Sequence, residues 1–145
     1  MRLSPHFTLD ELTVSATADA RGLSRVPPKV MINRLRAVAW NMENVRRALN
    51  DYAITVTSGW RSEAVNKAVG GVPGSDHLSA WCVDFRSKFG TPYQIVARLE
   101  QSGIAFDQLI NEQEKGIVHI SFAPAFRDQI LTQRGGSYIG GNHRA

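Results

Sequence analysis

Apolar residues recur at helical spacing across residues 28–49, the strongest helical pattern in the chain. The positions that share one side of this helix are Val30, Leu35, Val38, Met42, Val45 and Leu49. Pro27 and Pro28 introduce the segment, and proline suits the first turn because that turn needs no backbone donor. We therefore predict a long amphipathic helix whose apolar side faces the core.

Three shorter helices are predicted from the residues at their ends. A threonine followed three residues later by glutamate forms a capping-box pattern, which opens a short helix over 9–14. A serine cap and two closing glycines bound a second helix at 62–69. The third, 91–103, starts at Thr-Pro and closes at a glycine. A polar connection spans 15–27.

Alternation of apolar and polar residues predicts the strands. They are expected at 53–57, 81–85, 106–110 and 116–122, with a weaker one at 129–132. Helices followed by strands with short connections indicate an α+β fold with a small antiparallel sheet. We expect helices to pack on one face of this sheet, while the other face stays open.

Composition indicates one globular domain of ordinary size, with 43% hydrophobic and 21% charged residues. We assign residues 1–135 to this domain and the glycine-rich, basic segment 136–145 to a mobile tail. No apolar run is long enough for membrane insertion, and the N-terminus lacks a secretory signal pattern. The single cysteine, Cys82, excludes an internal disulfide and a cysteine zinc cluster, and we predict a packing role for it.

The net charge of +4 is unevenly distributed, because the ends of the chain are basic and the middle is slightly acidic. This distribution suits a cation site flanked by surfaces that favour a polyanion, although solvated surface is the default interpretation. No nucleic-acid motif accompanies the arginines of the long helix, so we expect no specific nucleic-acid partner.

Strand alternation places two potential metal ligands on the open face of the sheet. His119 in 116–122 and Asp84 in 81–85 both lie opposite the bulky apolar residues of their strands. His77 ends a glycine-rich loop seven residues before Asp84, and that loop can fold it over the same face. Each residue alone is more often a hydrogen-bonded or surface side chain. Together, two histidines and a carboxylate leave the fourth position of a tetrahedral zinc site open, as in catalytic sites.

A zinc hydrolase also needs a general base. The candidates are Glu112 and Glu114, in the turn before His119, and their alternative is a pair of solvated turn acids. Arg61 follows the first strand and could hold a substrate carboxylate or a developing oxyanion, with an ordinary surface arginine as the alternative.

These motifs in this order resemble the zinc D-alanyl-D-alanine carboxypeptidase and L,D-endopeptidase family of cell-wall peptidases. The quoted pieces are SGWRS at 58–62, SDH at 75–77, Asp84, and VHISF at 118–122. FTLDELT, NKAVGG and FDQLI also fall in the family order, so the resemblance covers most of the chain. It points to the compact single-domain branch often encoded by bacteriophages.

The resemblance implies one zinc ion with His77, Asp84 and His119 as ligands. It also implies that Arg61 contacts the substrate and the transition state. Two histidines and an aspartate of this kind are similar to the zinc site of hedgehog signalling domains, in which such a site need not imply turnover.

Further roles follow from the resemblance for polar residues near the metal. It implies that Ser75 and Gln108 face the substrate. It implies an acidic base shortly before the last histidine, and the position after LI-x favours Glu112 over Glu114.

One segment departs from the family pattern H-x-x-G-x-A-x-D. This chain has Ala80 and Cys82 at the two small positions, with Trp81 between them. Alanine in place of glycine is tolerable only if the backbone does not need positive φ. A different path there would shift Asp84 and weaken metal binding.

The resemblance implies a zinc metallopeptidase that hydrolyses amide bonds in peptidoglycan stem peptides, as a monomeric phage endolysin. Such a protein would be made in the host cytoplasm without a signal peptide and would act on the cell wall after release or virion delivery. The bond, D-Ala-D-Ala or L-Ala-D-Glu, is left open. The alternative is a non-catalytic structural or binding module that retains the fold, in a virion or elsewhere. The intact ligands favour the enzyme, and the altered segment 80–82 favours the alternative.

Overall fold

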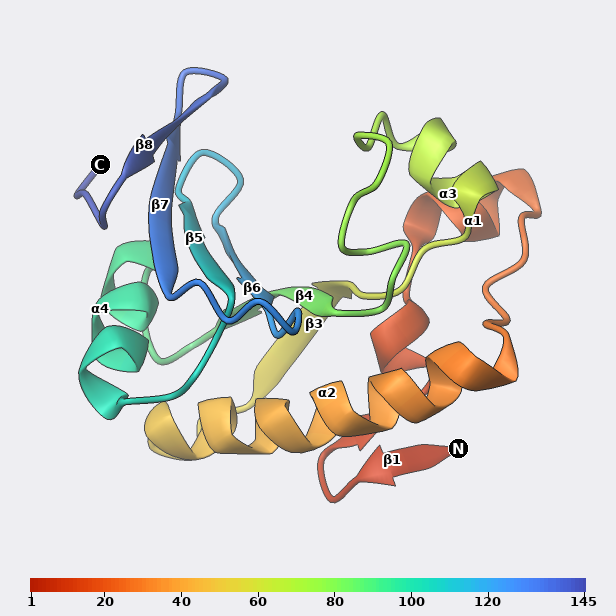
Figure 1. Ribbon diagram of the computed structural model, residues 1–145, viewed down its shortest axis with the longest axis horizontal. Helices are drawn as coiled ribbons and strands as arrows, with labels where there is room; N and C mark the ends of the chain where they lie inside the picture. The colour runs from red at the N-terminus through yellow and green to blue at the C-terminus, as the bar shows by residue number, and fades with distance from the viewer.

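A six-stranded sheet forms the centre of the computed structural model, which describes residues 1–145 (Figure 1). In spatial order its strands are β3 (Ile54–Ser58), β4 (Cys82–Ser87), β6 (Ile117–Ser121), β5 (Gln108–Glu112), β7 (Gln129–Arg134) and β8 (Ser137–Gly140). The α+β class and all five predicted strands are confirmed. Neighbouring strands are antiparallel except for β5 and β7, which pair in parallel.

Helices cover one face of the sheet, as predicted. The helices are α1 (Ala16–Arg21), α2 (Lys29–Ala48), α3 (Glu63–Ala68) and α4 (Pro92–Ser102). The apolar sides of α2 and α4 pack against Val83 and Phe85 of β4 and against Val118 and Ile120 of β6 in a single core. In Figure 1, α2 runs the length of the molecule beneath the strands, while α1 and α3 lie beyond the edge formed by β3. The second face of the sheet therefore stays open.

The long helix has nearly the bounds that its apolar period predicts. Its buried side includes Leu35, Val38, Met42 and Val45. Val30 was predicted on that side but is 60% exposed, because the buried stripe begins only after the first turn of α2. No helix has the length and apolar character needed to cross a membrane.

The N-terminal segment differs from the prediction. The expected helix at 9–14 is only a turn of 3-10 helix, Glu11–Thr13, although the reciprocal bonds between Thr8 and Glu11 form as the capping box requires. Before it, β1 (Arg2–Ser4) and β2 (Phe7–Thr8) make a separate hairpin. The predicted connection 15–27 contains α1, which Ser15 caps.

The segment 136–145, predicted as a mobile tail, contains strand β8 and a hydrogen-bonded end. The Thr132 hydroxyl donates to the Gly141 carbonyl at 2.8 Å and accepts from the His143 amide at 2.9 Å. The Asn111 side chain donates to the His143 carbonyl at 3.0 Å. The segment therefore extends the sheet next to β7, and its mobility stays a prediction.

Candidate metal centre and cleft

The register of β4 and β6 places Asp84 directly opposite His119. Asp84 Oδ1 lies 2.8 Å from His119 Nδ1. The neighbours of these residues along both strands, such as Val83 and Val118, are fully buried in the core on the other face. The predicted alternation therefore brings the carboxylate and the imidazole together on the open face.

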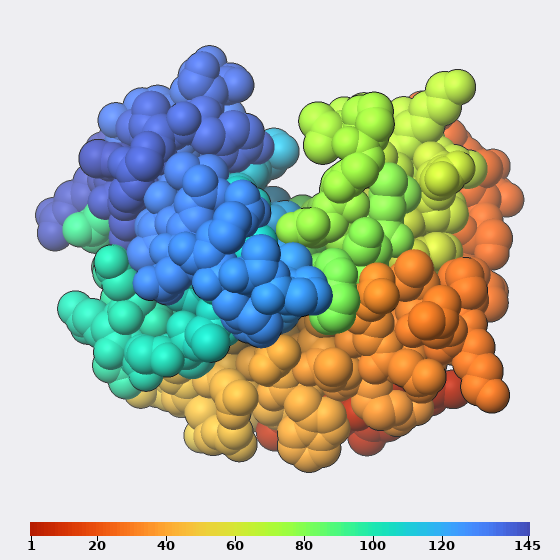
Figure 2. All heavy atoms as spheres, viewed as in Figure 1, coloured from red at the N-terminus to blue at the C-terminus, as the bar shows by residue number.

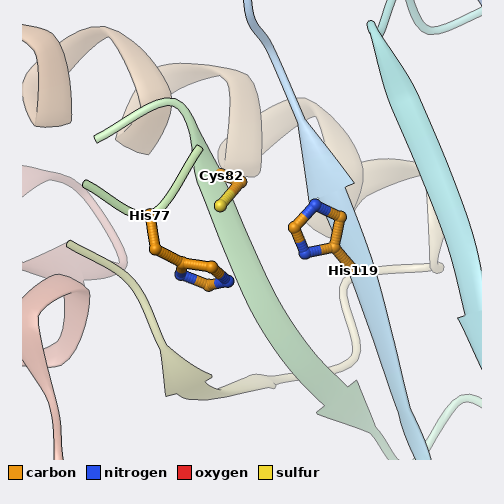
Figure 3. A group of neighbouring side chains, drawn as sticks. All are labelled: His77, Cys82 and His119. Carbon is orange, nitrogen blue, oxygen red and sulfur yellow. The ribbon is translucent and has the colours of Figure 1, made fainter. Parts of the chain in front are cut away.

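His77 reaches the same point from the loop between α3 and β4. Its Nε2 lies 3.3 Å from Asp84 Oδ2, and its ring centroid lies 5.4 Å from that of His119. Figure 3 shows the two imidazoles on opposite sides of β4, each directed toward the other. All three predicted ligands therefore converge, although they come from a loop and two strands.

A main-chain carbonyl sets the orientation of His77. Its Nδ1 lies 2.7 Å from the Gly59 oxygen, and this carbonyl can only accept, so Nδ1 carries the proton. In the neutral ring, Nε2 then presents a lone pair toward the anionic oxygen of Asp84. A cation between them removes this repulsion, and metal-bound histidines commonly donate their second nitrogen to such an acceptor. The donor chemistry fits a zinc ion.

Position 59 requires glycine because there is no room for a side chain, and not because its backbone needs a positive φ. A Cβ at this position would lie 2.0 Å from the Leu12 carbonyl oxygen, to which the Trp60 amide donates at 2.8 Å. The glycine of the SGWRS motif thus allows β3 to end against the N-terminal segment while its carbonyl faces His77. Sequence reasoning did not assign this role.

Cys82 is a further donor at the site. One candidate ligand atom from each of His77, Cys82 and His119 lies within 4.8 Å of the other two, so this cluster can bind one metal ion. Cys82 is fully buried on β4, near the two imidazoles (Figure 3). It stands two residues before Asp84 and therefore shares its face of the strand. The sequence predicted only packing for it, because a lone cysteine carries no spacing signal.

Charges in the site perturb its titratable groups. Burial raises the pKa of Asp84, but the interactions with His119 and His77 outweigh it and hold the pKa well below the usual range. Burial lowers the pKa of His119, but the bond with Asp84 and the charges of Asp84 and Glu112 raise it overall. Burial, followed by the charge of Asp84, raises the pKa of the Cys82 thiol well above its ordinary value. The close contact between Asp84 and His119 thus lowers the pKa of the carboxyl and raises the pKa of the imidazole.

The unusual segment 80–82 carries local strain. Ala80 adopts φ of +61°, in the left-handed region where a side chain costs roughly 1–2 kcal/mol. The glycine of the family pattern would avoid this cost, so the departure noted in the sequence is a real one. Arg34 of α2 supports the segment, because it donates to the Ser79 carbonyl at 2.7 Å and lies 4.3 Å over the Trp81 ring.

Arg61 lies beside the three predicted ligands. Its Nη2 is 3.9 Å from Asp84 Oδ2, and its Nε donates to the Ser58 hydroxyl at 3.2 Å. Ser75 accepts a hydrogen bond from the His77 amide at 3.2 Å, so it helps to shape the loop that carries this ligand. Both side chains line the cleft described below.

The two acidic residues that were predicted in the turn differ, because Glu112 is the last residue of β5 and only Glu114 lies in the turn itself. Glu112 is 6% exposed and accepts a hydrogen bond from the Tyr138 hydroxyl at 3.1 Å. Glu114 instead accepts from the Gly135 amide and is held at the turn between β7 and β8. Of the two, Glu112 lines the cleft with the ligands.

A cleft of about 460 Å³ surrounds the ligands. One wall consists of residues 69–72 after α3, and the other includes Leu131 of β7 and Tyr138 of β8. Figure 2 shows the corresponding hollow between the green segment near residue 70 and the blue C-terminal strands. Gln108 lies on the floor, where its amide donates to the Gln129 side chain at 2.8 Å. The predicted site residues Arg61, Ser75, His77, Asp84, Gln108, Glu112 and His119 all line this cleft.

A family model described as Peptidase M15 matches residues 5–121, which include every predicted site residue. No curated protein matches the chain.

Proposed function

The chain belongs to the peptidase M15 family of zinc-dependent peptidases, and on that premise we propose that it hydrolyses amide bonds in peptidoglycan stem peptides. The observation that carries the proposal is the convergence of His77, Asp84 and His119 at the floor of an open cleft. The cleft volume of about 460 Å³ suits a segment of extended peptide.

His77, Asp84 and His119 would hold the zinc ion, and the Cys82 thiol is a further possible donor. A zinc ion in such a site polarises a carbonyl and lowers the pKa of a coordinated water to roughly 7. The Gly59 carbonyl keeps the proton of His77 on Nδ1, so that Nε2 remains available as a ligand atom.

Glu112 is the general base in this proposal. It is the buried carboxylate of the cleft outside the ligand set, and its ion-pair partner is the exposed side chain of Lys115, whereas Glu114 is engaged by the β7–β8 turn. Glu112 takes a proton from the attacking water and returns it to the leaving amine. Arg61, held by Ser58 and Asn66, is placed to stabilise the negative charge that develops on the carbonyl oxygen.

We place the activity in a phage endolysin that acts as a monomer. In this proposal the protein is made in the host cytoplasm and reaches the cell wall after release or virion delivery. Ser75 and Gln108 are proposed to contact the substrate, because both lie in the cleft beside the ligands. The family supports D,D-carboxypeptidase and L,D- or D,D-endopeptidase activity alike.

A second candidate function is a structural or binding module with a closed zinc site. The specific observation in its favour is Cys82, which could supply a fourth protein ligand and so remove the open position of a catalytic zinc. Such a protein would bind zinc tightly and hydrolyse nothing.

The test is a turbidity assay on outer-membrane-permeabilised cells, with and without a zinc chelator. The proposal predicts clearing that the chelator abolishes and that added Zn²⁺ restores. Mass spectrometry of the released muropeptides identifies the bond that is cut. Full zinc occupancy without any released peptide would establish the structural module instead.

A further inference from the structure

The β7–β8 hairpin completes the cleft from outside the part of the chain that the family model matches. The match ends at residue 121, whereas the second cleft wall includes Leu131 and Tyr138. Figure 1 shows β7 and β8 standing beside β5 on the side opposite α3. The hairpin therefore adds residues to the site that the family assignment does not describe.

Tyr138 makes a side-chain hydrogen bond to the Glu112 carboxylate. Its hydroxyl lies 3.1 Å from Oε1 and donates, because the ionised carboxylate can only accept. The other oxygen, Oε2, is buried without a hydrogen bond, and Lys115 Nζ lies 3.2 Å from it. The phenol thus anchors Oε1, while the partner of Oε2 is the exposed ammonium group of Lys115.

The hairpin itself is tied down next to this contact. Tyr138 pairs with Gln133 in the β7–β8 register. The residues after β8 are held by Thr132 and by Asn111, and Asn111 is the immediate neighbour of Glu112 in β5. These bonds fix the hairpin against the strand that carries Glu112, so the phenol is presented to the carboxylate by two paired strands.

We propose that Tyr138 is a positioning residue for Glu112. This inference rests on the proposed function, in which Glu112 is the general base. The hydroxyl holds Oε1 and thereby fixes the carboxylate plane, which leaves Oε2 as the oxygen that exchanges the proton. Tyr138 is 52% exposed, and its ring also forms part of the cleft wall.

The experiment compares Tyr138→Phe, which removes only the hydroxyl, with Tyr52→Phe, which removes the hydroxyl of a tyrosine outside the cleft. Hydrolysis of soluble muropeptides prepared from purified peptidoglycan is measured as kcat and KM. We expect Tyr138→Phe to lower kcat about tenfold, as for loss of a hydrogen bond to a charged group, with KM and zinc content unchanged. Tyr52→Phe should match the wild type.

A double mutant separates positioning from a general structural effect. In the Glu112→Gln background, adding Tyr138→Phe should cause no further loss, because the hydroxyl acts through the carboxylate that is already absent. Wild-type kcat in Tyr138→Phe, or losses that multiply in the double mutant, would overturn the proposal.

A readout without turnover distinguishes failure of this inference from failure of the proposed function. Burial, the negative charge of Glu112 and the hydrogen bond between them raise the pKa of Tyr138, and the charge of Asp84 acts in the same direction. The cations that share the cleft are Lys115 and Arg61, beside the imidazoles of His77 and His119. Spectrophotometric phenol titration should show a lower Tyr138 pKa in Glu112→Gln. A wild type that hydrolyses no muropeptide ends the proposed function, whereas an unchanged phenol titration ends the contact.

Discussion

Asp84 and His119 face each other across two paired strands, with the carboxylate oxygen 2.8 Å from the imidazole nitrogen. Both residues are fixed by the backbone hydrogen bonds of the sheet, which is the kind of rigid element that supports a defined ligand geometry. His77 is the predicted ligand that comes from a loop. The precision of the metal site therefore depends on the contacts that hold this loop, above all on the Gly59 carbonyl.

Removal of a proposed ligand should weaken zinc binding far more than removal of another histidine. We expect Asp84→Ala and His119→Ala to lower zinc affinity by at least about 100-fold. Loss of a residue that only hydrogen-bonds to a metal ligand already lowers the affinity by about 10- to 100-fold. His143→Ala, which removes an exposed histidine bonded to the Gly140 carbonyl, should bind zinc as the wild type does. Competition with a chromophoric chelator measures the affinities. Equal affinity in all variants would place the metal elsewhere.

Substitution with Co²⁺ tests whether Cys82 is a ligand. Asp84 oxygens lie 2.8 and 3.3 Å from the two imidazole nitrogens, so we expect carboxylate coordination. The Co²⁺ protein should show no thiolate-to-metal charge-transfer absorption, and Cys82→Ala should retain full metal content. A strong charge-transfer band that disappears in Cys82→Ala would favour the closed, structural site.

The two acids of the turn provide a matched pair of variants. Glu112→Gln should reduce kcat by about 10²- to 10⁴-fold, the usual contribution of a general base. Glu114→Gln should keep nearly full activity, because its side chain accepts from the Gly135 amide and a glutamine oxygen can do the same. Zinc content should be unchanged in both. The reverse order of activities would reassign the base to Glu114.

Gly59→Ala should destabilise the fold and disturb His77 together. The added Cβ would lie 2.0 Å from the Leu12 oxygen, and we expect a loss of at least about 2 kcal/mol as for other overpacked sites. Gly140→Ala is the control, since no atom lies within 4 Å of a Cβ there. Denaturant unfolding measures the stability, and competition with a chelator measures the zinc affinity. Wild-type values for Gly59→Ala would contradict the close approach.

Asp107 should make stability fall in acid. Hydrogen bonds from Arg127 hold the pKa of Asp107 below its usual value, against the opposing effect of burial. A lowered folded-state pKa means that the unfolded chain binds the proton first. The contribution is therefore complete above the unfolded pKa of about 3.9 and is lost as the pH falls through the folded value.

Urea unfolding at several pH values measures this dependence. Asp107→Asn should be less stable at pH 7 by roughly 1–3 kcal/mol and should show a flatter profile below about pH 4. Asp128→Asn changes an exposed aspartate nearby and serves as the control. A profile for Asp107→Asn parallel to the wild type would remove this ion pair as a source of acid sensitivity.

Periodicity predicted the parts of the fold in which one side is buried. α2, α4 and the strands follow from it because their apolar residues must face one core. The weaker elements escaped prediction for physical reasons. α1 is a six-residue helix with little apolar surface, and β8 is an exposed strand whose pairing depends on β7. The parallel pairing of β5 with β7 depends on the topology of the chain, which local sequence patterns do not reveal.

Strand alternation and the family motifs predicted the part of the candidate site that contains the three predicted ligands. Asp84 and His119 could be placed on one face, and the loop spacing allowed His77 to join them. Contacts that depend on tertiary distance could not be foreseen, such as the thiol of Cys82 or the hydroxyl of Tyr138. The sequence showed that alanine replaces a glycine at position 80, but the positive φ of Ala80 could be learned only from the structure.

The acceptor that orients His77 belongs to the polypeptide backbone, so no exchange of side chains can delete it. A substitution at position 59 acts only by crowding Leu12 and pushing the strand end away. The tautomer of His77 therefore depends on the path of the backbone at Gly59. Mutations at this position disturb it through the size of the new side chain and not through the loss of a functional group.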